Sequence, residues 1–130
     1  MRAALFAAVF SVGAQAAAFD CSNPQSGPEI THCAGLAYEA ADLTLNEAYR
    51  LAVDAARLRD AESDGSWDIS AETLLREAQR AWIPFRDAAC SAESTLYRGG
   101  TGQTMLYLNC LERVTETRTY DLLYFAEADR

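Results

Sequence analysis

The chain has 130 residues, enough for one domain, and 19 acidic against 11 basic side chains give it a formal net charge of −8. All the basic side chains are arginine. Such an acidic protein repels nucleic acid and anionic lipid and favours basic partners, so we expect neither nucleic-acid nor membrane-surface binding. Solubility alone would also explain the charge, and composition does not choose between the two explanations.

Residues 1–18 are expected to be a secretory signal peptide. Arg2 precedes an apolar run from Ala3 to Val12, and two small-x-small patterns follow, at residues 14–16 and 16–18. The run is too short to cross a bilayer, which needs about 20 apolar residues. Cleavage before Ala17 or Phe19 is expected. Residues 19–130 would then form one helical domain of net charge −9, because residues 1–18 contain one arginine and no acid.

The mature protein is expected to be periplasmic or secreted, without a lipid anchor. Asp20 lies beside Cys21, and an acid there fits a lipoprotein cleavage site poorly. An even number of cysteines in a small exported chain predicts disulfides, here two. No C-x-x-C spacing occurs and His32 is the only histidine, so we expect no metal and no cofactor. The four cysteines, which allow three pairings, are Cys21, Cys33, Cys90 and Cys110.

The first predicted helix runs from Pro28 to about Leu58. Proline suits the first helical turn, and Glu29 favours the positive end of the helix dipole. One apolar stripe at helical spacing contains Tyr38, Leu45, Tyr49 and Ala52. The acidic, glycine-containing stretch Arg59–Ile69 then predicts a loop.

A second helix is expected from the N-cap Ser70 to about Cys90, with a kink at Pro84. Residues 91–103 contain three glycines and predict a connection. A third helix from about Thr104 to Phe125 follows. Since no strand pattern of useful length appears, the sequence predicts an all-α, disulfide-stapled bundle of three principal helices in up-down-up order.

The helix order places all four cysteines at one end of the bundle. Topology therefore leaves the pairing open. We favour Cys21–Cys33 and Cys90–Cys110, because each partner is then the nearest cysteine in sequence. Closing a loop of roughly 20 residues should stabilise the fold by about 3 kcal/mol in the chain-entropy model.

Several polar residues lie on the predicted apolar stripes. An unpaired buried charge is costly, so Asp42 is expected to pair with Arg86 or Arg118. The pattern favours an interhelical polar network that sets helix register. A catalytic role with Asp42 as base is the alternative, and it requires a pocket open to solvent. The residues of this structural network are Asp42, Asn46, Gln79, Arg86 and Arg118.

Three blocks of residues follow one another along the mature chain: Thr31-His32-Cys33-Ala34 with Tyr38, Ala41-Asp42, Leu45-Asn46 and Tyr49; Ala78-Gln79-Arg80-Ala81-Trp82-Ile83 with Arg86-Asp87-Ala88 and Cys90; and Gly99-Gly100-Thr101 with Cys110-Leu111, Thr115, Arg118 and Leu122. In this order they resemble the LprI-like lysozyme-inhibitor family, long catalogued as a domain of unknown function. The second block is the most specific. The chain departs from the family at Pro84, where members usually continue the helix, and it lacks the lipoprotein cysteine of some members.

The resemblance implies an exported bacterial binding protein that inhibits lysozyme by occluding its cleft, with no enzymatic activity. No short motif carries the inhibitory surface, so no activity transfers residue by residue. The alternative is a periplasmic adaptor or stress protein that binds another envelope protein and leaves lysozyme active.

Acids around one tryptophan make the loop between the first two helices the candidate partner-binding site. An aromatic anchor with steering charges suits a cationic cleft. The plainer alternative is a solvated linker whose tryptophan folds back on the bundle. The segment Tyr97-Arg98-Gly99-Gly100 is a second candidate, although its glycines also suit backbone geometry alone. The candidate loop residues are Asp60, Glu62, Asp64, Trp67 and Asp68.

Overall fold

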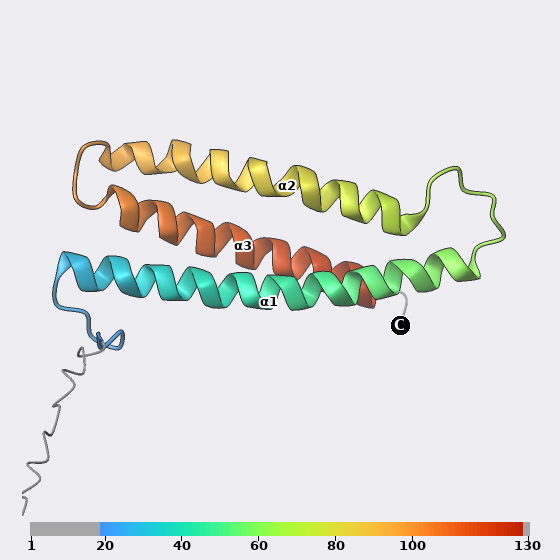
Figure 1. Cartoon of the computed structure of the whole chain (residues 1–130), viewed down its shortest axis with the longest axis horizontal. Coiled ribbons are helices and arrows are strands. Elements are labelled where there is room, and N and C mark those ends of the chain that lie inside the picture. Colours follow the sequence, from blue (N-terminus) through green and yellow to red (C-terminus); the bar gives the residue numbers. More distant parts are fainter. Residues whose placement is uncertain (1–18, 129–130) are drawn as a thin grey trace, which may run out of the picture.

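The computed structural model of the protein describes residues 19–128, so the expected signal peptide at residues 1–18 lies outside the described part. Three long helices are α1 (Gly27–Glu62), α2 (Ala71–Ser94) and α3 (Gln103–Glu127), with a short 3-10 helix η1 (Thr95–Tyr97) after α2. Figure 1 shows α1 and α3 running in the same direction and α2 in the opposite one. The predicted all-α, up-down-up bundle is therefore confirmed for this part of the chain.

The helix α1 begins at a capping box. The backbone N–H of Glu29 donates to Ser26 Oγ at 3.4 Å, and the N–H of Ser26 donates back to Glu29 Oε2 at 3.2 Å. The helix then continues four residues beyond the expected end at Leu58, so the predicted start of the loop at Arg59 is wrong. Tertiary contacts explain the extension, because Arg59 Nη2 donates to the carbonyl of Phe125 at 2.7 Å.

The helix α2 begins after Ser70, as predicted, where Ser70 Oγ accepts from the N–H of Thr73 at 3.1 Å. It continues through Pro84 to Ser94, so the expected end at Cys90 is four residues too early. The glycines that predicted the connection lie only at positions 99, 100 and 102, and the residues before them are compatible with helix. Ser91 Oγ donates to the Asp87 carbonyl at 2.7 Å and Ser94 Oγ to the Ser91 carbonyl at 2.8 Å.

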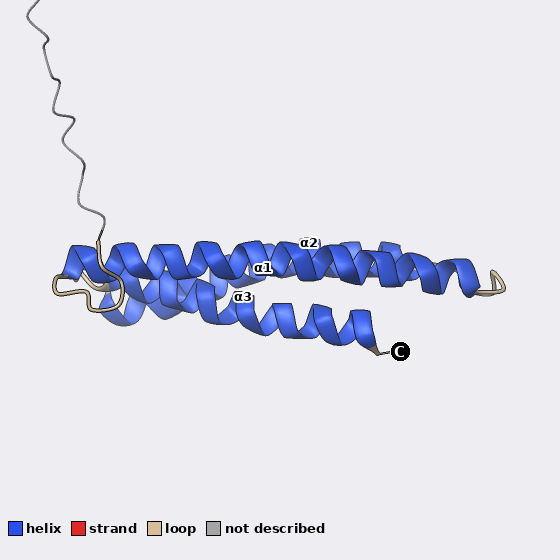
Figure 2. Cartoon of the chain, turned by 90° about the horizontal axis from the view of Figure 1, so that it is seen from below, coloured by secondary structure: helices blue, strands red, loops and turns tan. Residues whose placement is uncertain are grey.

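The core lies between α1 and α3 and is built largely from alanine. Small side chains let the backbones of two helices approach closely, and they bury little apolar area each. Figure 2 shows α3 inclined to the other two helices, and Figure 1 shows α1 extending beyond the end of α3. Within residues 19–128, no helix is both long and apolar enough to span a bilayer. The buried apolar residues of α1 are Ala34, Ala41, Leu45, Ala48, Ala52, Val53 and Ala56.

Both favoured disulfides, Cys21–Cys33 and Cys90–Cys110, are present, and they lie at the same end of the bundle. Cys90 and Cys110 are 0% and 2% exposed and form a small core with Leu111. Cys21 lies in an exposed segment before α1. The second disulfide thus joins α2 to α3 from the inside, and the first ties the N-terminal segment to α1.

Replacing Cys90 and Cys110 with alanine should lower the free energy of unfolding by about 3 kcal/mol, since the bond spans a sequence separation of 20 and is buried. Urea denaturation followed by circular dichroism measures this loss. The matched C21A/C33A variant should lose less, because that bond spans 12 residues and holds an exposed segment. A greater loss from C21A/C33A would contradict the expectation that the buried Cys90–Cys110 bond contributes more to stability.

Candidate protein-binding site

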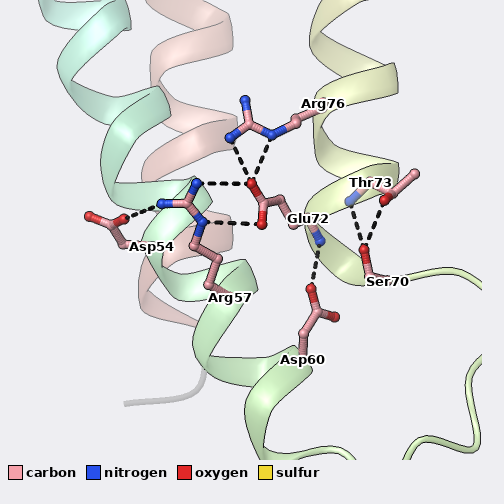
Figure 3. A network of polar contacts seen from close by, with 7 residues as sticks. All are labelled: Asp54, Arg57, Asp60, Ser70, Glu72, Thr73 and Arg76. Carbon is pink, nitrogen blue, oxygen red and sulfur yellow. Dashed lines mark hydrogen bonds and ion pairs between the residues drawn. The ribbon is translucent and has the colours of Figure 1, made fainter.

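The segment 63–70, which joins α1 to α2, is fixed at its base by caps on the N-terminus of α2. Asp60, in the last turn of α1, accepts the backbone N–H of Ala71 at Oδ1 (2.6 Å) and that of Glu72 at Oδ2 (3.0 Å). Ser70 caps the same helix locally, as Figure 3 shows. The first four backbone N–H groups of a helix have no acceptor within the helix. The contacts of Asp60 and Ser70 supply acceptors for such N–H groups at the start of α2.

An ionic bridge between α1 and α2 lies beside these caps (Figure 3). Arg57 of α1 donates from Nε to Glu72 Oε2 at 3.1 Å, and its Nη2 lies 3.1 Å from Oε1. Arg76, one turn along α2, donates from Nη2 to Glu72 Oε1 at 2.6 Å. Hydrogen bonds from Arg57 and then Arg76 hold the pKa of Glu72 below its ordinary value, and Glu72 in turn raises the pKa of Arg76.

The tip of the segment presents Trp67 to solvent, with 76% of the residue exposed. Trp67 therefore does not fold back on the bundle, contrary to the alternative interpretation of this loop. Gly65 adopts a φ of +75°, a conformation that favours glycine and turns the chain. Asp64 Oδ1 accepts the N–H of Ser66 at 3.0 Å. Hydrogen bonds from the side chain and backbone of Ser66 lower the pKa of Asp64, so its carboxylate stays charged.

The structure separates the candidate loop residues into two groups. Asp60 is half-buried and bonded to the start of α2, so its structural role is that of an anchor. The exposed group at the tip contains Glu62, Asp64, Trp67 and Asp68.

Apolar residues that the sequence analysis did not single out surround this tip. Ile69 and Leu74 are exposed, and with Trp67 they line a hollow of about 300 Å³ at the ends of α1 and α2. Together with the exposed acids, these side chains form what we call the distal surface: Glu62, Asp64, Trp67, Asp68, Ile69 and Leu74.

The polar network at the middle of the bundle divides into a group of three residues around Asp42 and a separate pair. Arg86 Nη1 lies 3.5 Å from Asp42 Oδ1, and Asn46 Nδ2 donates to Asp42 Oδ2 at 3.2 Å. Arg118 instead donates from Nε to Gln79 Oε1 at 3.0 Å. Of the two partners expected for Asp42, the structure thus selects Arg86.

Arg86 is the buried member of its pair. Its side chain is 9% exposed and lies against the rings of Tyr38 and Trp82, whereas the Asp42 side chain is 40% exposed. Asp87 also binds the Arg86 guanidinium, at 2.8 Å from Nε. Burial raises the pKa of Tyr38, and the nearby Arg86 opposes this rise. The arrangement neutralises a buried cation and ties α1 to α2, so it is suited to fixing register.

The remaining candidates lie at the cysteine end. His32 is exposed, with its ring 5.1 Å from that of Phe19. Tyr97 is exposed, and Gly99 has a φ of +79°, which accounts for a glycine at that turn. Within residues 19–128, no three His, Cys, Asp or Glu side chains gather in a way that could hold a metal ion.

Comparisons with known proteins agree with this architecture. A family model described as "Lysozyme inhibitor LprI" matches residues 21–122. An uncharacterized protein of Rhizobium meliloti (strain 1021) is 38% identical over 112 residues, which cover 84% of this chain and 80% of that protein. The crystal structure of a DUF1311 family protein from Pseudomonas putida KT2440 superposes with a TM-score of 0.67 at 18% identity, covering 85% of this chain and 100% of that one. At this identity the crystal structure supports the fold alone.

Replacing Asp60 with alanine should lower the free energy of unfolding by about 1–2 kcal/mol, because two N–H groups of α2 lose a charged acceptor. Urea denaturation measures the change. Asp68→Ala removes an exposed acid of the same loop and should leave the stability unchanged. Equal losses in the two variants would show that Asp60 does not anchor α2.

Glu72 should make the stability depend on pH. Its pKa in the folded protein lies below the ordinary value of 4.5, so its contribution is complete above that value and is lost as the pH falls through the folded pKa. The stability gap between the wild type and Glu72→Gln should therefore be largest near pH 7 and close as the pH falls below 4.5. Urea denaturation across this range tests it, with Glu77→Gln as the exposed control on α2. A gap that stays constant with pH would contradict the bridge.

Proposed function

The chain belongs to the LprI lysozyme-inhibitor family, and from that membership we propose that it is an exported bacterial protein that binds lysozyme and inhibits it by occluding the substrate cleft. The family is one of inhibitors and not of enzymes. Two disulfides also favour an extracytoplasmic location, where thiols are oxidised.

The observation that carries the proposal is the exposed Trp67 on an anchored loop. A tryptophan that becomes buried in a partner's pocket is a frequent hot spot of protein interfaces. Caps from Asp60 and Ser70 hold the base of the loop before any partner arrives, so less conformational entropy is lost on binding. The distal surface is thus prepared to insert one aromatic side chain into a cleft.

The charges of the distal surface suit a basic enzyme. Glu62, Asp64 and Asp68 are exposed acids of the distal surface, and hydrogen bonds from Ser66 lower the pKa of Asp64 further. Acidic groups at the rim accelerate association with a basic protein, and salt weakens the effect. The net charge of −9 for residues 19–130 acts in the same direction.

Trp67→Ala should weaken the inhibition of a hen-type lysozyme at least tenfold, because the anchor is lost. The measurement is the lysis rate of a cell-wall suspension at increasing inhibitor concentration, at low and at high salt. Phe85→Ala, which removes an exposed aromatic residue of α2, is the matched control and should inhibit like the wild type.

Asp64→Asn with Asp68→Asn should mainly slow association and reduce the dependence on salt. Wild-type protein that does not inhibit at micromolar concentration would overturn the lysozyme proposal. Capture of a different envelope protein through Trp67 would then favour the adaptor function. Inhibition that is unchanged in Trp67→Ala would instead move the inhibitory surface elsewhere on the bundle.

A further inference from the structure

A second surface of the bundle has the features of a docking groove, and it lies apart from the distal surface. The groove has a volume of about 520 Å³, and its lining comes from α1 and α3 with no residue of α2. It follows the first half of α1, towards the cysteine end. The lining residues are Ala37, Ala40, Ala41, Thr44, Glu112, Glu116, Thr119, Tyr120 and Leu123.

Tyr120 is an exposed aromatic side chain in the lining of this groove, and further exposed apolar residues lie on α1 and α3. Leu36, Leu43 and Leu51 of α1 are exposed and recur after seven and eight residues, a spacing that places them on one face of a helix. Tyr120 and Tyr124 are exposed on α3. Tyr120 is 75% exposed, so its ring is free to contact an occupant of the groove.

The dimensions of this surface match a helix. The floor is made of small residues at positions 37, 40, 41 and 44, which lets another backbone approach closely. From Glu112 to Leu123 the α3 side of the groove rises about 16 Å, at about 1.5 Å per residue. A partner helix of about three turns would cover that length.

The charges of the groove select a basic occupant. Glu112 and Glu116 line it, and within residues 19–128 neither has a cationic partner. Arg113, which lies between them in sequence, is engaged by Glu93, with Nη2 2.6 Å from Oε2. Among the described residues, no basic side chain lines the groove. A second copy of this acidic chain would be repelled, and so would nucleic acid or anionic lipid.

We propose that the α1–α3 groove binds a basic amphipathic helix of a partner protein or peptide. The apolar face of that helix lies against Ala37, Ala40 and Tyr120, and its Lys or Arg side chains pair with Glu112 and Glu116. This is the helix-in-groove mode of recognition, with apolar anchors at i, i+3, i+4 and i+7. It does not depend on lysozyme inhibition by the distal surface.

The test is a calorimetric titration of the disulfide-bonded protein with a synthetic peptide of about 16 residues, composed of Leu and Lys in an amphipathic helical pattern. Two control peptides accompany it. One has the same composition in an order that breaks the pattern, and the other carries Glu in place of Lys. We expect binding of the first peptide at low salt, at least tenfold weaker binding of the reordered peptide, and no binding of the Leu/Glu peptide.

Variants then locate the site. Glu112→Gln with Glu116→Gln should weaken the binding about tenfold and flatten its dependence on salt. Ala40→Phe should fill the groove and abolish the binding, with circular dichroism confirming the fold. Glu77→Gln and Trp67→Ala, which lie outside the groove, should bind the peptide like the wild type. Equal binding of the ordered and reordered peptides, or wild-type affinity in the Glu112/Glu116 variant, would overturn the proposal.

Discussion

Alanine forms most of the buried face of α1, and Ala34, Ala41 and Ala48 recur there at intervals of seven residues. This spacing keeps small side chains against α3 over several turns, so the two helices, which run in the same direction, pack along a long contact (Figure 1). Close approach is gained at the cost of apolar area, because a methyl group buries much less surface than a leucine side chain. The bundle therefore has a long core with little hydrophobic stabilisation per turn, and other interactions have to hold its ends together.

The two ends are held by different chemistry. At one end, the buried Cys90–Cys110 bond joins α2 to α3 covalently. At the other end, where α3 does not reach as far as α1, Asp60 caps α2 and the Glu72 bridge connects α1 with α2 (Figure 3). The loop between these helices is thereby fixed at its base, and its exposed tip is left to present Trp67. An anchored base and a free tip are what a preorganised binding loop requires.

The sequence was informative where the determining interactions are local. Helical periodicity, the Ser70 cap and the pairing of neighbouring cysteines each depend on residues close in the chain, and each was predicted. The end of α1 depends on contacts distant in sequence, because Asp60 bonds to the N–H groups of residues 71 and 72 and Arg59 to Phe125. The sequence therefore did not distinguish Asp60, which caps α2, from the exposed acids of the loop. The groove was missed for a similar reason, since it exists only where the outer faces of α1 and α3 lie side by side.

Arginine supplies all the basic side chains of the chain, and it forms ion pairs between the helices. A guanidinium group can bind a carboxylate through two parallel hydrogen bonds, and Arg57 and Arg86 both tie α1 to α2 through acids of the opposite helix. Arg113 likewise joins α3 to α2 through Glu93. Each of these ion pairs removes one positive and one negative charge from what a partner meets, so pairing leaves the net charge of the chain unchanged. Among the described residues, Glu112 and Glu116 have no such partner, so the excess of acids is felt locally where they lie, on the outer face of α3.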